Sequence, residues 1–428
     1  MLSRMEHDSI GALNVPAEAY YGVQSMRAAT NFQITHRPLH PVLIDSIVMV
    51  KKAAAITNEK SGKLDQQIAQ AIIQACDEIL DGNLRDQFIV DAIQGGAGTS
   101  ANMNANEVIA NRAIEILGGT KGDYSIVHPN DHVNMSQSTN DVIPTAGKIT
   151  VLKLLPQTIK ELEKLEKAME EKEAEFDDIL KMGRTQLQDA VPMRLGQSFG
   201  AFAHVLKKDI KRLKNVMDEM KVLNIGATAN GTAINVAPYY LANISYELSK
   251  VAGISLKQAD DLIDATQNLD GFVSVSGVLK TCAVDISKIS NDLRLMSFGP
   301  RTGLSEINLP ARQNGSSIMP GKINPVIPEV VSQVAYLIIG HDYTITMAAE
   351  AGQCEEYIEK SVGISTALCP YIGYAKSAEI AKKSLKTGIS VKELVLEEGL
   401  LKEEELKEIL KPEKMTQPMR EKVMKAVS

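Results

Sequence analysis

The stretch VLKLLPQTIKELEKLEKAMEEKEAEFDDIL, residues 151–180, repeats apolar side chains at intervals of mostly three or four residues. This spacing matches the period of an α-helix and predicts one long amphipathic helix. Similar stripes occupy 199–220 and 272–296, and another begins after Pro325. Helices of roughly 25 residues are about twice the usual length. Several in succession predict a mainly α protein built around a bundle of long helices. The first stripe consists of Leu155, Ile159, Leu162, Leu165, Met169, Phe176 and Ile179.

The regions on either side of these stripes differ from them in composition. Residues 1–140 are richer in glycine, asparagine and proline and hold most of the histidines, whereas the C-terminal end has short charged segments such as KEEELKEILK. We expect three domains. They are a mixed, mainly helical N-terminal domain over 1–140, a central long-helix bundle over 141–356 and a small helical domain over 357–428.

Composition excludes several classes of protein. A net charge of −7 without a concentrated basic surface argues against nucleic-acid binding. The apolar runs are too short to cross a bilayer, and the first residues lack the apolar block of a secretory signal. The cysteines have neither metal-ligand spacing nor the density of a disulfide framework. We therefore expect a cytoplasmic protein with reduced thiols and no membrane partner. The cysteines are Cys76, Cys282, Cys354 and Cys369, of which Cys282 falls in an apolar helical stripe.

Polar residues gather in four clusters: GGAGTSANMNAN, HPNDHVNMSQSTNDV, GRTQLQDAVP and GSSIMPGKINP. In the first, Thr99 opens a helix after a glycine-rich loop. In the second, Ser138 to Asp141 cap the first long helix. We take the third as another polar interruption of the helices, and in the fourth Asn324 as the N-cap of a helix whose first residue is Pro325.

One such cluster is most often only a helix cap, but four together suggest a binding site. Helix N-termini offer unpaired N–H groups and a partial positive charge, which suit carboxylates and phosphates. Lys322 adds a full positive charge. If the long helices bring these ends together, they form a pocket for a small, doubly anionic molecule.

Two other arrangements are weaker candidates for a site. His128 and His132 have the spacing of a helical zinc pair, but Pro129, Asn130 and Asp131 between them argue against a helix. No third ligand presents itself, so we expect no metal site. A Ser-His-Asp triad is not excluded by spacing, yet no nucleophile elbow of the G-x-S-x-G type occurs.

The clusters resemble those of the aspartase/fumarase superfamily of lyases. GSSIMPGKINP matches the superfamily signature G-S-S-x-M-P-x-K-x-N. The likeness begins near RMEHDSIGALNVPAEAYYGVQS and continues almost to the C-terminus. Within the superfamily, the double tyrosine Tyr20–Tyr21, Gln186 and the stretch MAAEAG are similar to members that act on aspartate. Fumarases usually have tryptophan in place of the second tyrosine, and fumarases and some aspartases have histidine in place of Gln186.

The resemblance implies a three-domain fold and the reversible conversion of L-aspartate to fumarate and ammonia without a cofactor. In the family, the serine-rich loop closes over the substrate. Its first serine, here Ser316, removes a proton beside the distal carboxylate and gives an aci-carboxylate dianion. Backbone N–H groups of a glycine-flanked turn and the nearby Lys322 would stabilise the serine alkoxide once water is excluded.

The resemblance also assigns the remaining site residues. One group contacts a carboxylate and the amine of the substrate. A second group holds the carboxylate on which charge develops. A third group lies with Lys322 on the other side of the substrate. No general acid is identified. The family's sites combine segments from three subunits of a homotetramer, which we expect here too. The three groups are Thr99, Ser138, Thr139 and Asn140; Thr185 and Gln186; and Ser317 and Asn324.

One departure from the family pattern concerns assembly. The two sides of a long helical hairpin are joined directly near Glu355–Glu356. Roughly 40 residues are missing there, which corresponds to some 60 Å of helix. Their absence would expose apolar faces of neighbouring helices. The missing residues leave open a non-catalytic scaffold with a lyase-like fold. A fumarate hydratase, which would use the same serine and dicarboxylate pocket, also stays open beside the ammonia-lyase.

Overall fold

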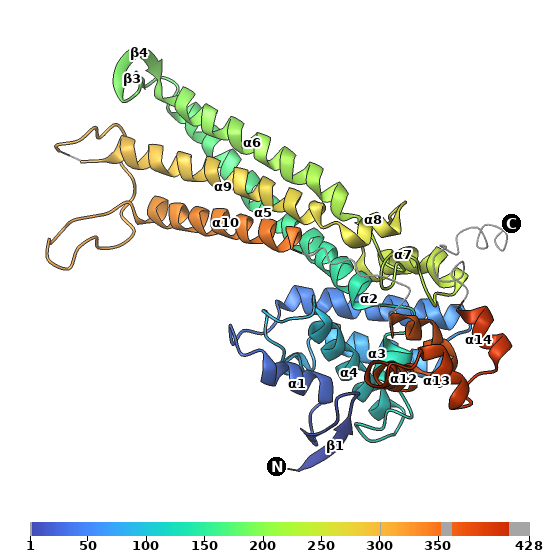
Figure 1. The fold of residues 1–428 in the computed structure, drawn as a ribbon. Coiled ribbons are helices and arrows are strands. Elements are labelled where there is room, and N and C mark those ends of the chain that lie inside the picture. The colour runs from blue at the N-terminus through green and yellow to red at the C-terminus, as the bar shows by residue number, and fades with distance from the viewer. Residues whose placement is uncertain (1, 300, 352–361, 411–428) are drawn as a thin grey trace. The chain divides into compact units, whose positions relative to one another are not determined.

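The computed structural model describes residues 2–299, 301–351 and 362–410. The chain forms two compact units. Figure 1 is coloured by residue number, so the segments of each unit can be followed along the chain. The expected division into three domains stays a prediction, and the junction near Glu355 lies outside the described residues. The first unit comprises Met1–Thr150, Lys221–Asn268 and Gln353–Ser428, and the second comprises Val151–Met220 and Leu269–Gly352.

The second unit is a bundle of long helices, as the sequence predicts. Helix α9 packs against both α6 and α10. The predicted stripe on α6 is largely buried, with Leu206 and Leu213 completely covered. Cys282 on α9 is buried as an ordinary apolar residue. The mainly α fold class is therefore confirmed. The helices are α5 (Thr139–Glu175), of which the C-terminal part belongs to this unit, α6 (Leu195–Met220), α9 (Asp270–Ser297) and α10 (Val326–Glu350).

The first stripe ends earlier than predicted. Helix α5 stops at Glu175, and a β-hairpin follows, formed by β3 (Leu180–Thr185) and β4 (Gln188–Arg194). Phe176 lies past the helix end and packs edge-on against Phe199 of α6, with ring centroids 5.2 Å apart. The last apolar positions of the stripe therefore serve the turn into α6 and the hairpin instead of a longer helix.

Helix α10 presents its apolar stripe to the outside of its own chain. The side facing α9 is small and polar, since Asp342 accepts hydrogen bonds from Ser276 Oγ at 2.8 Å and Lys280 Nζ at 2.6 Å. The predicted stripe residues Val330, Val334 and Leu337 are 48%, 50% and 58% exposed. The periodicity therefore predicted the helix, but the described part of the chain leaves its apolar face exposed.

The N-terminal part of the first unit is built around α2 and α4. Helix α2 packs against α3 and α7, and α4 packs against α1 and α3. Every residue of α4 from Ala101 to Asn111 is buried. Its elements are β1 (Ser3–His7), β2 (Ala12–Pro16), α1 (Val23–Asn31), α2 (Pro41–Lys60), α3 (Gln66–Leu80), η1 (Arg85–Gln87), α4 (Thr99–Ile116), η2 (Pro129–Val133), the start of α5, β5 (Val222–Leu223), α7 (Pro238–Ala252), β6 (Lys257–Gln258) and α8 (Leu262–Gln267).

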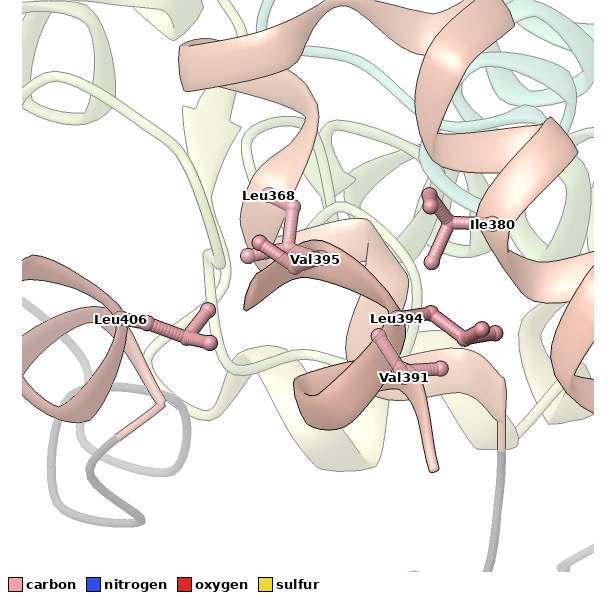
Figure 2. Close-up of a cluster of buried hydrophobic side chains, with 6 residues drawn as sticks. All are labelled: Leu368, Ile380, Val391, Leu394, Val395 and Leu406. Carbon is pink, nitrogen blue, oxygen red and sulfur yellow. The ribbon is translucent and has the colours of Figure 1, made fainter. Parts of the chain in front are cut away.

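The C-terminal part of this unit consists of short helices, as predicted. Figure 2 shows their buried apolar cluster, in which Leu394 and Val395 meet Leu368 and Ile380. Within the described residues, no helix has the length and apolar character needed to cross a membrane. The elements are η3 (Val362–Leu368), α11 (Cys369–Ile372), α12 (Tyr374–Thr387), α13 (Val391–Glu397) and α14 (Glu403–Ile409).

Candidate active site

The first two polar clusters meet in the first unit. Gly98 precedes α4 with a left-handed φ of +89°, and a Cβ at this position would lie only 2.9 Å from Ile143 Cγ1 on α5. One turn into α4, Asn102 Nδ2 donates to Thr139 Oγ1 at 3.1 Å. The glycine therefore allows close approach, and the N-terminal ends of α4 and α5 lie side by side.

The N-terminus of α5 is capped as predicted. Ser138 Oγ accepts a hydrogen bond from the Asn140 amide at 3.3 Å, and Asp141 Oδ1 accepts one from the Ser138 amide at 2.9 Å. Asp141 Oδ2 also accepts from the amides of Gly226 and Thr228. These reciprocal bonds satisfy N–H groups that a helix start leaves unpaired. They also join the tip of α5 to the 224–228 loop.

Asn140 and Thr99 already use part of their hydrogen-bonding capacity within the chain. Asn140 Nδ2 donates to the Ala229 carbonyl at 2.7 Å. The exposed Thr99 donates its hydroxyl proton to the Gly96 carbonyl at 2.7 Å. Thr139 Oγ1 acts as an acceptor for Asn102, which leaves its proton as a donor. Thr99 would have to break its hydrogen bond to the Gly96 carbonyl before its hydroxyl could donate to an anion.

A buried lysine lies behind this pair of helix tips. Lys51 Nζ donates to Asn134 Oδ1 at 2.8 Å and to Gln137 Oε1 at 3.0 Å, and Asn134 Oδ1 also accepts from Asn102. Lys51 is completely buried. The loss of hydration lowers the pKa of its ammonium to about 7. Burial likewise raises the pKa of the Asp141 carboxyl to about 6, although its hydrogen bonds and Lys51 act in the opposite direction.

The third cluster lies in the second unit and does not cap a helix. Thr185 ends β3, and Gln186 with Leu187 forms the two-residue turn to β4. Both turn residues have positive φ, +52° and +62°, which is the backbone of a tight hairpin turn. Thr185 and Gln186 are exposed at this turn. The polar residues therefore mark a hairpin that the sequence analysis did not predict.

The fourth cluster forms a closed loop ahead of α10. Its neck is held by hydrogen bonds from the Gly315 amide to the Lys322 carbonyl at 2.8 Å and from Asn324 Nδ2 to the Gly315 carbonyl at 3.0 Å. Inside the loop, Ser316 Oγ accepts from the amides of Ile318 and Met319 at 3.2 and 3.0 Å. The predicted amide N–H groups around the serine oxygen are thus present. Ser317 and Lys322 are exposed on this loop.

The prediction that Asn324 caps α10 is wrong. The helix begins at Val326, and no side chain caps its first turn. The Asn324 amide turns back to Gly315 instead, because the loop closes across nine residues of sequence. Pro325 therefore precedes the helix rather than starting it.

The two histidines are used in local hydrogen bonds. His132 Nδ1 accepts from the His128 amide at 2.9 Å, and His128 Nδ1 accepts from the amides of Asn130 and Asp131. Pro129, Asn130 and Asp131 argued against a helix here, whereas residues Pro129–Val133 form a single π-helical turn. Burial lowers the pKa of both imidazoles. Among the described residues, no group of three His, Cys, Asp or Glu side chains is placed to hold a metal ion.

The four predicted clusters are thus divided equally between the two units. The structure brings Ser138, Thr139 and Asn140 together with the start of α4, and it holds Ser316 among backbone amides. Sequence reasoning missed Lys51 and Asn102, which support the tip of α5, whereas it included Asp141 in the cap of that helix. The run NMNAN offered a signal for Asn102, because asparagines are unusual in a helix that is otherwise buried.

Comparison with known proteins places the chain in a family. A family model described as lyase matches residues 11–340, and one described as fumarase C C-terminus matches 364–417. An aspartate ammonia-lyase from a Bacillus species is 49% identical over 97% of this chain and 98% of its own. The aspartate ammonia-lyase of Escherichia coli K12 is 45% identical over 97% and 96%.

The lengths of these alignments bear on the predicted missing residues. They extend over 457 and 460 residues, more than the 428 of this chain, so the relatives carry residues that this chain lacks. Neither family model covers 341–363. The position of the gap, near Glu355, stays a prediction.

Solved structures share the fold. A Brucella melitensis protein described as fumarate lyase:delta crystallin, bound to cobalt, superposes with a TM-score of 0.81 at 46% identity, covering 97% of this chain and 100% of that one. A class II fumarase from Schistosoma mansoni gives 0.79 at 32% identity with the same coverage. The chain belongs to the aspartate ammonia-lyase family of the aspartase/fumarase superfamily.

Proposed function

We propose that the chain catalyses the reversible elimination of ammonia from L-aspartate to give fumarate, with Ser316 as the base and no cofactor. The higher identity to aspartate ammonia-lyases, 45–49%, than to the class II fumarase, 32%, favours this reaction over hydration of fumarate. The observation that carries the mechanism is the pair of amide N–H groups that already point at Ser316 Oγ.

The chemistry follows from this arrangement. The Ser316 alkoxide takes a proton from the carbon beside the distal carboxylate, and the electron pair moves onto that carboxylate. Collapse of the resulting dianion forms the carbon–carbon double bond and expels the amine as ammonia. An alkoxide is a rare species in water, but amide dipoles and the Lys322 ammonium stabilise it where water is excluded. The serine then returns its proton to solvent.

The helix tips and the hairpin supply the binding groups. Thr139 keeps a hydroxyl proton for a substrate carboxylate, and Asn140 Oδ1 is suited to accept from the substrate's ammonium because Nδ2 already donates to Ala229. Ser138 and Thr99 add their hydroxyls to this group. Charge develops on the other carboxylate, which the hairpin residues Thr185 and Gln186 would hold. Ser317, Lys322 and Asn324 would complete the loop side.

A direct assay separates this reaction from its alternative. The purified chain is incubated with L-aspartate or with L-malate, and fumarate is followed by its absorbance. Fumarate from malate alone would assign a hydratase instead. We expect Ser316→Ala to lower the rate by about 10²–10⁴, the usual contribution of general acid–base catalysis. A Ser316→Ala variant as fast as the parent would remove the serine mechanism for either substrate.

We also propose that the chain works as a homotetramer in which several subunits complete each site. The support is the uncovered apolar stripe on α10, together with the division of the site clusters between two units. Leu337→Arg should lower the mass measured by light scattering and abolish turnover. The control is Leu385→Arg on α12, a more exposed leucine at 72%, which should leave both unchanged. A stable, inactive monomer of the parent chain would favour the scaffold.

The free cysteine thiols are consistent with a location in the cytoplasm. Cys76, Cys282 and Cys369 are free, and the first two are buried. Free cysteines are usual in reducing compartments. We therefore propose that the chain functions in the cytoplasm.

A further inference from the structure

One carboxylate joins the hairpin to the segment that carries Ser316. Glu306 lies in the connection between α9 and α10, ten residues before the serine in sequence. Its Oε2 is 2.8 Å from Lys181 Nζ, and its Oε1 accepts a hydrogen bond from an Arg184 guanidinium nitrogen. The Glu306 side chain is only 15% exposed. Glu306, Lys181 and Arg184 therefore form a largely buried ion-pair cluster rather than a solvated surface pair.

The hairpin is shaped to make both contacts. Residues 181 and 184 of a regular strand would point to opposite faces. A register shift between Met182 and Arg184 interrupts the ladder, and both basic side chains reach the same carboxylate. At the shift, a Cβ on Gly183 would lie 2.7 Å from the Val191 carbonyl oxygen. Glycine is thus required where the strand changes direction.

The other side of the contact is fixed to the end of α9. The amides of Glu306 and Ile307 both donate to the Met296 carbonyl, at 2.8 and 3.3 Å. Burial acts to raise the pKa of the Glu306 carboxyl, but the Lys181 ammonium and the hydrogen bond from Arg184 outweigh it and hold the pKa below its ordinary value. Glu306 is therefore an anion bound from two elements and anchored by its own backbone.

Both proposed substrate segments begin at this cluster. Arg184 directly precedes Thr185 in the hairpin. The loop of Ser316 is closed at its own neck, and residues 307–314 connect this neck to Glu306. We propose that Glu306 is a positioning residue, which fixes the Thr185–Gln186 turn and the Ser316 loop for the reaction through its joint contacts with Lys181 and Arg184. The role in turnover rests on the proposed function.

The test compares two carboxylates that face Arg184. Glu306→Gln keeps the shape of the side chain but removes its charge. We expect its kcat for fumarate formation to fall about tenfold to a hundredfold, because small misplacements of catalytic groups have effects of this size. KM should change little. Asp189→Asn is the control, since Asp189 is 76% exposed and 3.7 Å from Arg184 Nε; it should keep the parental kcat. Glu306→Asp should recover part of the loss.

A second measurement does not depend on the reaction. Hydrogen exchange followed by mass spectrometry should show faster exchange over 180–194 and 307–324 in Glu306→Gln, with unchanged melting temperature and mass, and no change in Asp189→Asn. Parental exchange and parental kcat in Glu306→Gln would overturn the proposal. If the parent chain produces no fumarate, the proposed function fails, and exchange alone decides whether Glu306 holds these segments. A kcat loss matched by equal loss of folded tetramer would assign Glu306 to stability and overturn the positioning role.

Discussion

Replacing Gly315 by alanine tests whether the closed neck of the serine loop is the reactive form. Gly315 is needed for lack of space rather than for its φ, because a Cβ there would lie 2.8 Å from the Asn324 backbone N and side-chain Cγ. Alanine must push apart the two chain segments that form the neck. That movement breaks the Gly315–Lys322 and Asn324–Gly315 hydrogen bonds.

The size of the effect follows from these two bonds. Each contributes about 1 kcal/mol, so the closed neck loses about 2 kcal/mol relative to open forms. At 1.4 kcal/mol per factor of ten, its population falls about thirtyfold. If only the closed neck places Ser316 Oγ among its amides, kcat for fumarate formation should fall by the same factor. The loop lies on the surface, so we expect the melting temperature to change little.

The assay is initial rate by fumarate absorbance, with Gly321→Ala as the matched variant. Gly321 lies in the same loop with open space around its Cβ position and a φ of +78°. Alanine there costs only the left-handed backbone strain of about 1 kcal/mol, equivalent to about fivefold. Parental kcat in Gly315→Ala, or a larger loss in Gly321→Ala than in Gly315→Ala, would refute the reasoning.

Three further predictions concern stability and are measured by urea unfolding. Gly340→Ala should stabilise by about 0.5–1 kcal/mol, because Gly340 lies inside α10 with free space around its Cβ position; no gain would contradict this. Gly98→Ala should cost about 1–3 kcal/mol more than Gly118→Ala, since both have positive φ but only Gly98 meets a side chain, that of Ile143; equal losses would exclude the steric account. Lys51, whose folded-state pKa is lowered to about 7, contributes stability that is present above its ordinary pKa of 10.5 and lost as the pH falls through 7. In Lys51→Met the free energy of unfolding should not fall with pH in this range. A fall as large as in the parent would mean that other groups cause the pH dependence.

Local signals in the sequence account for what could be predicted. Apolar periodicity is a property of neighbouring turns, so it located α6, α9 and α10 within a few residues. The Ser138 cap was also predictable, because Asp141 completes it three residues later. The same signals do not indicate which part of the protein covers an apolar stripe. They predicted the stripe with Val334 and Leu337 but not that these side chains stay exposed among the residues that the structure describes.

The errors arose where distant residues decide a conformation. Asn324 has the residue type of a helix cap, yet a carbonyl nine residues earlier takes its amide. The third cluster indicated a polar interruption of the helices, and only the pairing of β3 with β4 makes Gln186 a turn residue. No local signal singled out Lys51 or Glu306, because their partners Asn134 and Lys181 are far away in sequence.

The shorter length of this chain should affect assembly rather than chemistry. The stretch that neither family model covers, 341–363, contains none of the proposed site residues, which lie between Thr99 and Asn324. It does contain the end of α10, where Tyr343 and Met347 are 70% and 50% exposed. An uncovered apolar face is an association surface or an aggregation hazard. Turnover per assembled site should therefore match that of longer relatives, while activity per chain should fall on dilution as the proposed tetramer dissociates. Low activity that does not change with protein concentration, in a chain that remains tetrameric, would instead place the defect in the site itself.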